Sequence, residues 1–294
     1  MATDLLSADT ATAACPTARP ADSVSPKGCV SVDASPTEPG SETEIVSTNG
    51  AGRGSSAVNA EKTVAGEGRS AFSLLLSDYL QLTKPRIVVM ILVTTCATAM
   101  MGATGLVAVG SLAWLLFGTA AIAGSAGTGN QIWERVIDAR MTRTANRPIS
   151  SGRMSAVPAA IFAAVLGIVG ISVLAMQFGK EPAAVGVATW MLYVLVYTPM
   201  KVRTPWNTTV GAIAGAIPVL IGYTATGGLL TDWTGWLLVG VLVAWQYPHF
   251  MAIAWMYRRQ YKEAGFKMTT TEEPTGRSAG WQSIVGSAVL LGWE

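Results

Sequence analysis

Three oxygen-bearing side chains follow one another at helical spacing early in the chain. Asn130, Glu134 and Asp138 lie at i, i+4 and i+8, so on a helix they form one stripe about 12 Å long. Oxygen ligands grouped in this way suit Mg²⁺, which binds through one or two carboxylates together with the phosphates of a substrate. The spacing therefore predicts a catalytic Mg²⁺ site whose ligands are these three residues.

Cationic side chains accompany the stripe. Arg143 and Arg147 follow it within a few turns, and Lys201 and Arg203 occupy a second polar segment farther along the chain. Guanidinium groups bind phosphate oxygens in pairs, and a lysine binds them as a point charge. We predict that these four residues hold a diphosphate. The competing interpretation is that the charges only solvate helix ends and that Lys201 is a snorkelling lysine.

The distribution of charge indicates a membrane protein. Only 13% of the 294 residues are charged, whereas a soluble domain has about 25%. A bilayer core requires about 20 apolar residues per helix. Uncharged runs cover residues 87–133, 154–179, 182–200, 204–231, 233–257 and 278–293. The first run is long enough for two spans, broken near 102–111. We expect an all-α polytopic helical bundle with six full spans and a truncated seventh.

The basic residues alternate between the two sides of these spans. Of the 15 Lys and Arg from Lys84 onward, only Lys180 falls outside the segment before span one and the loops after spans two, four and six. Basic loops remain in the cytoplasm. The sequence therefore predicts a multi-pass protein of the bacterial inner membrane, with a cytoplasmic N-terminus and cytoplasmic polar loops.

The first 70 residues have a different composition, rich in Ala, Ser, Thr, Gly and Pro. Such a segment has too little apolar surface to form a core. We expect residues 1–76 to be a disordered cytoplasmic tail, and 77–294 to be the membrane domain. The three cysteines show no spacing typical of a disulfide framework or a metal site. No nucleic-acid-binding patch is visible either.

His249, the only histidine, lies inside an uncharged run. Ionisable residues within a span are costly and usually functional, and imidazole is a common ligand of haem iron. A hydrogen-bonded structural histidine is an equally good interpretation from chemistry alone.

Four segments taken together resemble one family of enzymes. They are NQIWERVIDARMTRTANRPISSGRMS (130–155), YTPMKVRTPWNTTVGAIAGAIPVLIGYTA (197–225), WQYPHFMAIAWMYRRQYKEAGFKM (245–268) and LTKPRIVVMILVTT (82–95). They are similar to the protohaem IX farnesyltransferases, a branch of the UbiA-type intramembrane prenyltransferases. The resemblance covers roughly residues 78–294.

The resemblance implies a helical bundle, usually of nine spans, around a cavity open to the cytoplasm. It implies transfer of the farnesyl group of farnesyl diphosphate to a vinyl group of haem b, giving haem O, with Mg²⁺ assisting departure of diphosphate. It assigns Mg²⁺ and diphosphate to Asn130, Glu134 and Asp138, and places His249 at the haem. Membrane lipid and a downstream haem A synthase or terminal oxidase assembly are the further partners that it implies.

The chain departs from the family pattern in two places. Gln260 stands where an acidic residue is usual, so a second metal contact would have to come from Glu263 or be absent. The last uncharged run has only 16 residues, so we expect the prenyltransferase domain to be C-terminally incomplete by about two spans.

Three alternative functions remain open from the sequence. One is a UbiA-type enzyme with an aromatic or quinone-precursor acceptor, against which His249 and its flanking segment argue. The second is a polytopic transporter, although transporter sites usually lie near the bilayer midplane rather than at one boundary. The third is a haem-binding membrane protein without catalysis, which would not require the acidic stripe.

Overall fold

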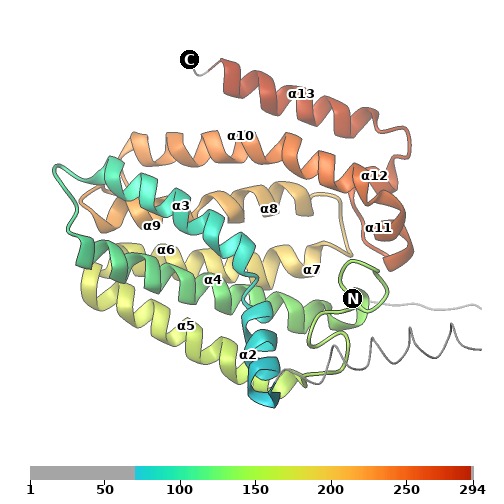
Figure 1. The fold of residues 1–294 in the computed structure, drawn as a ribbon. Helices are drawn as coiled ribbons and strands as arrows, with labels where there is room; N and C mark the ends of the chain where they lie inside the picture. The colour runs from blue at the N-terminus through green and yellow to red at the C-terminus, as the bar shows by residue number, and fades with distance from the viewer. Residues whose placement is uncertain (1–69, 293–294) are drawn as a thin grey trace, which may run out of the picture. The chain divides into compact units, whose positions relative to one another are not determined.

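Long apolar helices packed side by side make up the molecule (Figure 1). The computed structural model describes residues 70–292, all within one unit, Ala60–Glu294, and no strand occurs among them. The helices are α2 (Ala71–Leu82), α3 (Pro85–Gly102), α4 (Val109–Asp138), α5 (Ala156–Phe178), α6 (Lys180–Met191), the π-helix η1 (Leu192–Tyr197), α7 (Thr198–Met200), α8 (Asn207–Ala216), α9 (Pro218–Ala225), α10 (Trp233–Met256), α11 (Arg258–Ala264), α12 (Thr269–Glu272) and α13 (Arg277–Leu291).

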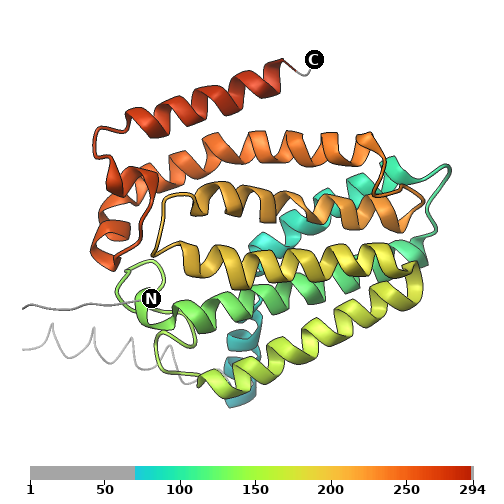
Figure 2. The same cartoon turned by 180° about the vertical axis from the view of Figure 1, so that it is seen from behind.

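Six helical stretches are long and apolar enough to cross a membrane, which confirms the predicted spans. They are α3, α4, α5, the continuous run α6–η1–α7, the run α8–α9, and α10. The break expected near 102–111 is the short connection between α3 and α4. Helix α13 covers most of the last uncharged run and lies along α10 (Figure 2). The chain is a polytopic membrane protein.

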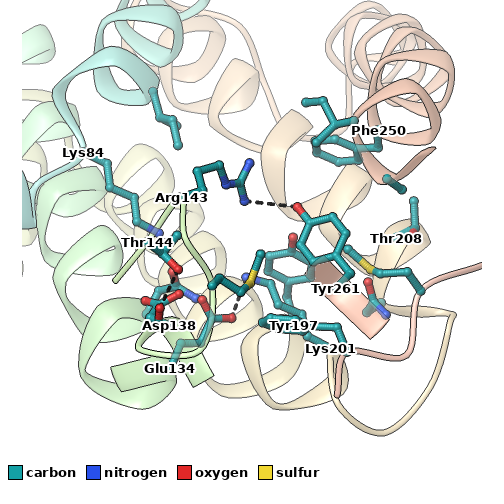
Figure 3. A pocket seen from close by; sticks show the side chains of 18 of the residues that line it. Lys84, Glu134, Asp138, Arg143, Thr144, Tyr197, Lys201, Thr208, Phe250 and Tyr261 are labelled. Atoms are coloured by element: carbon teal, nitrogen blue, oxygen red, sulfur yellow. Dashed lines mark hydrogen bonds and ion pairs between the residues drawn. The ribbon is translucent and has the colours of Figure 1, made fainter. Parts of the chain in front are cut away.

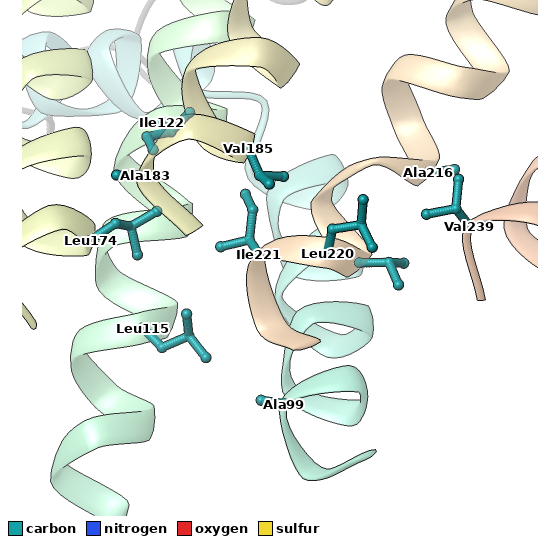
Figure 4. Close-up of a cluster of buried hydrophobic side chains, with 11 residues drawn as sticks. Ala99, Leu115, Ile122, Leu174, Ala183, Val185, Ala216, Leu220, Ile221 and Val239 are labelled. Atoms are coloured by element: carbon teal, nitrogen blue, oxygen red, sulfur yellow. The ribbon is translucent and has the colours of Figure 1, made fainter. Parts of the chain in front are cut away.

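The apolar core fills the half of the bundle where α4 begins. Side chains from all six spans meet there (Figure 4). They come from the end of α3, the start of α4, the end of α5, the start of α6 and the α8–α9 run, joined by Val239 of α10. Tight packing at this end leaves the other half of the bundle, where α4 ends, for polar groups.

Helices α3 and α9 approach each other closely through glycine. A Cβ added at Gly222 would lie 2.2 Å from the carbonyl oxygen of Thr95, and one at Gly102 would lie 2.3 Å from that of Tyr223. The Thr98 hydroxyl donates to the Val219 carbonyl oxygen at 2.9 Å across the same contact. Only glycine permits this approach, which fixes the first span against the fifth.

The predicted boundary at residue 77 falls inside helix α2. Residues 1–69 lie outside the described residues, so the tail expected over 1–76 is described only at its end. There, residues 71–76 form the first half of α2, whose N-cap Ser70 accepts a hydrogen bond from the Ser73 amide. The helix forms because a cap precedes a leucine-rich run whose later turns pack on the bundle. The ordered part therefore begins at least six residues before the expected boundary.

The α3–α9 contact supports a prediction about stability. Gly222→Ala should lower the melting temperature in detergent, because the added methyl meets a backbone carbonyl that cannot move alone, and overpacking typically costs about 1–3 kcal/mol. Gly110→Ala is the matched control, since a Cβ there meets nothing within 4 Å. Equal melting temperatures for the two variants would contradict this account of the contact.

Candidate active site

The predicted stripe lies on the last third of α4 and faces a cavity. Asn130, Glu134 and Asp138 are 0%, 4% and 2% exposed, yet all three line a space of about 220 Å³ (Figure 3). A single water needs only about 10–15 Å³. These polar groups therefore surround a volume that a ligand can enter.

Each carboxylate of the stripe is paired with a cation from a later segment. Glu134 accepts a hydrogen bond from the Lys201 ammonium at 2.7 Å, and Asp138 accepts one from Arg147 at 2.5 Å. Burial acts to lower the pKa of Lys201, but the Glu134 carboxylate together with Tyr197 and Tyr193 raises it more, so the pKa of Lys201 lies above its ordinary value. Lys201 therefore stays charged at neutral pH and neutralises Glu134.

A third cation, Lys84, was not predicted as a site residue. It immediately precedes α3 in a left-handed backbone conformation with φ of 55°, and its ammonium donates to the Asn130 side-chain oxygen. Burial lowers the pKa of Lys84 from its ordinary value. Non-glycine residues adopt this conformation at a cost of about 1–3 kcal/mol, which often marks a functional position. The sequence signal was present, because this lysine lies one residue before Pro85 at the start of the first uncharged run.

The π-helix in the fourth span supplies the aromatic wall of the cavity. Pro199 cannot donate a backbone hydrogen bond, and its ring crowds the preceding turn. The helix therefore widens into the π-helix η1 just before Pro199. The Thr198 hydroxyl donates to the Tyr193 carbonyl oxygen at 2.8 Å and accepts from the Asn130 amide at 3.0 Å. Tyr193 and Tyr197 both line the cavity, and the Lys201 ammonium lies 4.5 Å from the Tyr197 ring centroid.

Arg143 lines the cavity without an acidic partner among the described residues. Its guanidinium donates to the Tyr261 hydroxyl at 3.1 Å and lies 4.7 Å from the ring centroid of Tyr257 (Figure 3). The loop after α4 is held near α11 because Met141 packs with Tyr261 and Phe266. This arrangement keeps one arginine available for an anionic ligand.

Two predicted site residues lie outside the cavity. Arg203 is exposed and is not among the lining residues, so its predicted diphosphate contact is not supported. His249 is also exposed, with its ring stacked on Trp245 at a centroid distance of 5.0 Å. Its neighbour Phe250 does line the cavity, which places His249 beside the cavity wall rather than within it. Haem binding by His249 remains a prediction.

Of the two alternatives for the second metal contact, the structure favours its absence from the cavity. Glu263 is exposed and does not line it, and the Gln260 side-chain oxygen is buried without a hydrogen-bond partner. Within residues 70–292, no group of three or more His, Cys, Asp or Glu is placed to hold a metal. A cation in this cavity would therefore have two carboxylates, the Asn130 amide oxygen and the oxygens of a bound anion as its ligands.

Comparison with known proteins agrees with this chemistry. The UbiA prenyltransferase family model matches residues 91–293. The chain belongs to this family. Over 211 residues it is 63% identical to a Rhodopirellula baltica protein named "Protoheme IX farnesyltransferase", covering 72% of this chain and 74% of that protein. A Solibacter usitatus protein of the same name is 40% identical over 230 residues, covering 74% of this chain and 77% of the relative.

Solved structures of UbiA proteins share the fold of this family member. A UbiA homologue from Archaeoglobus fulgidus, bound to DMAPP and Mg²⁺, superposes with a TM-score of 0.63 at 16% identity, covering 72% of this chain and 75% of the other. The same homologue bound to GPP and Mg²⁺ gives a TM-score of 0.61. At this identity the similarity supports the helical architecture alone.

The Glu134–Lys201 pair gives a second prediction about stability. Lys201→Met should lower the melting temperature markedly, because removing one partner of a buried pair costs up to about 3–5 kcal/mol. The double variant Glu134→Gln/Lys201→Met should recover most of the loss, because no unpaired charge remains. Thermal unfolding in detergent checks both, and equal melting temperatures for the single and double variants would contradict the pairing.

Proposed function

We propose that this chain transfers the farnesyl group of farnesyl diphosphate to a vinyl group of protohaem IX, which yields haem O. The observation that carries the proposal is the cavity in which one helix presents three oxygen ligands to four surrounding cations. That set of groups suits a diphosphate and a divalent metal. The printed names of relatives that are 63% and 40% identical support haem as the acceptor.

The metal that best fits the cavity is Mg²⁺. Glu134, Asp138 and Asn130 supply hard oxygen ligands on one face of α4, and Mg²⁺ commonly binds through one or two carboxylates plus substrate phosphates. The neighbour bound to DMAPP and Mg²⁺ supports the same choice. When bound, the metal would neutralise negative charge on the leaving diphosphate.

The cations of the cavity would bind the diphosphate. Arg143 already lacks a carboxylate partner among the described residues, while Lys201 and Arg147 would exchange theirs for phosphate oxygens. Charge withdrawn from the diphosphate weakens the bond between C1 of the farnesyl chain and its oxygen. Positive charge then develops at C1, where the faces of Tyr193 and Tyr197 can stabilise it.

In the overall reaction one C–O bond breaks and two bonds form. The outer vinyl carbon of protohaem bonds to C1 of the farnesyl chain, and diphosphate leaves with the electron pair. The inner vinyl carbon, now cationic beside the porphyrin ring, takes up the oxygen of water and a proton is released. Farnesyl diphosphate, protohaem and water thus give haem O and diphosphate.

We also propose that the cavity opens toward the cytoplasm of a bacterial cell, in its inner membrane. The segments that supply the cavity cations lie before α3 and after α4 and α7, on the side of the spans where basic residues collect. Substrates and Mg²⁺ would then enter from the same side.

The acceptor is the first point to test. Membranes containing the full chain, supplied with farnesyl diphosphate, Mg²⁺ and protohaem, should yield a product with the mass of haem O after extraction. The parallel reaction with an aromatic quinone precursor in place of protohaem should yield none. Prenylation of the quinone precursor alone would replace the proposed acceptor while leaving the diphosphate site intact.

Matched arginine variants test the diphosphate site. Arg147→Gln should lower the rate of product formation by about 10²–10³-fold, as is typical when an electrostatic contact to the reacting group is lost. Arg203→Gln makes the same change outside the cavity and should stay within about twofold of the unchanged chain. Equal losses of rate in the two variants would show that the rate depends on the overall positive charge of the loops and not on the cations of the cavity.

The stripe itself is tested by Asp138→Ala and Asn130→Ala. Each should abolish transfer, because the ligands of the divalent metal are incomplete, while the protein still inserts in the membrane. Near-normal haem O formation by Asp138→Ala would overturn the assignment.

A further inference from the structure

Helix α2 runs across the spans rather than along them. Figures 1 and 2 show it crossing the bundle beside the end of α4 and the start of α5. The Tyr79 ring contacts Phe162 with a centroid distance of 4.8 Å, Leu82 is fully buried, and Asp78 pairs with Arg153 at 3.0 Å. One side of α2 is therefore fixed to the bundle.

A second side of α2 is apolar and is not covered by any other part of residues 70–292. Phe72, Leu76 and Leu80 lie at i, i+4 and i+8, and each is more than half exposed. The neighbouring stripe carries Ser73, Ser77 and Gln81 at the same spacing. In its second half the helix thus has three sides, one on the bundle, one apolar and one polar. In its first half Leu74 and Leu75 are exposed as well, at 48% and 51%.

The depth of α2 along the bundle matches the membrane interface. Its contact Phe162 lies six residues into α5, about 9 Å from the helix start at 1.5 Å per residue. The hydrocarbon core is about 30 Å thick, and the whole bilayer about 40–45 Å, so each headgroup layer spans several ångströms. Because α5 has 23 residues, about 34 Å, it exceeds the core by only a few ångströms, so this level lies within about 10 Å of the boundary between headgroups and acyl chains, the depth to which in-plane helices bury their apolar face.

The C-terminal end of α2 is connected directly to the cavity. The Gln131 side-chain amide donates to the carbonyl oxygens of Gln81 and Leu82 at 3.0 and 3.1 Å, which caps the helix. Gln131 adjoins Asn130, and Lys84 donates to Asn130 two residues beyond the end of α2. Movement of α2 would therefore displace Lys84 from the cavity.

We propose that α2 is an in-plane membrane anchor, with Phe72, Leu76 and Leu80 inserted in the lipid leaflet at the cavity end of the bundle, and that this anchorage holds Lys84 in the site. Lipid is the occupant because the apolar stripe continues onto the exposed face of α3, where Met90 and Val93 are also more than half exposed. The only charge on α2, Asp78, is already paired, so insertion should not depend on anionic lipid.

Spin-label accessibility tests the orientation. In the full chain with Cys15, Cys29 and Cys96 replaced by Ser, a nitroxide is attached at Leu76→Cys or at Leu74→Cys. These leucines are 51% and 48% exposed, but at 3.6 residues per turn they point about 160° apart. In phosphatidylcholine vesicles, the label at 76 should be accessible to oxygen and shielded from a nickel chelate, and the label at 74 should show the reverse.

Two outcomes of this labelling would overturn the proposal. Equal access of the nickel chelate to both positions would mean that the stripe faces water. A short distance between labels at 76 on two chains would mean that a second copy covers the stripe. Neither result depends on the chemistry of the cavity, so the orientation is tested independently of the proposed function.

The link to Lys84 rests on the proposed diphosphate site and needs its own measurement. Leu76→Asp in nanodiscs should weaken binding of inorganic pyrophosphate with Mg²⁺ by about tenfold, the loss expected for one charge-assisted contact. Leu74→Asp adds the same charge on the polar side and should have no effect. Equal affinities for the two variants would refute the link, whereas absence of pyrophosphate binding in the unchanged chain would refute the proposed function instead.

Discussion

Charge compensation at the end of an apolar bundle is the constraint on which the site depends. Glu134 and Asp138 are nearly inaccessible to solvent on a membrane helix, where an unpaired carboxylate would be strongly destabilising. Each is neutralised by a cation from a different later segment. The pairs that stabilise the buried carboxylates also place, within reach of one ligand, the groups that would bind a divalent metal and a diphosphate.

The rest of the fold serves this arrangement. Apolar side chains fill the half of the bundle away from the cavity, and glycine contacts such as Gly222 with Thr95 fix the spans there. At the other end, the chain leaves the helices to form the loops that carry Arg147 and Arg143. The wide turn of η1 places the Thr198 hydroxyl against the Asn130 amide. The cap of α2 by Gln131 places the Lys84 ammonium against the Asn130 side-chain oxygen. Rigid packing at one end thus permits a polar cavity at the other.

The sequence predicted what depends on local periodicity. Uncharged runs located the six spans, and the spacing of Asn130, Glu134 and Asp138 placed them on one helix face, as the structure shows. Contacts between distant segments were not predictable: Tyr261 meets Arg143 across 118 positions, and Lys84 meets Asn130 across 46. Arg203 was predicted to bind the diphosphate because it is close to Lys201 in sequence. It does not line the cavity, because sequence proximity does not determine the direction of a loop side chain. The first half of α2 was not predicted, because its N-cap Ser70 and residues 71–76 were included in the expected disordered tail.

In the proposed site, Lys201 and Arg147 exchange their carboxylate partners for phosphate oxygens when the diphosphate binds. Binding of Mn²⁺ to the purified full chain, measured by electron paramagnetic resonance, tests this exchange most directly. Without pyrophosphate, Lys201→Met should bind Mn²⁺ at least about tenfold more tightly than the unchanged chain, because Glu134 is released. Arg143→Met removes the same charge from the same cavity without releasing a carboxylate, and its affinity should change far less. If both variants gained affinity equally, the carboxylate pairs would not control the metal site, and the account would be contradicted.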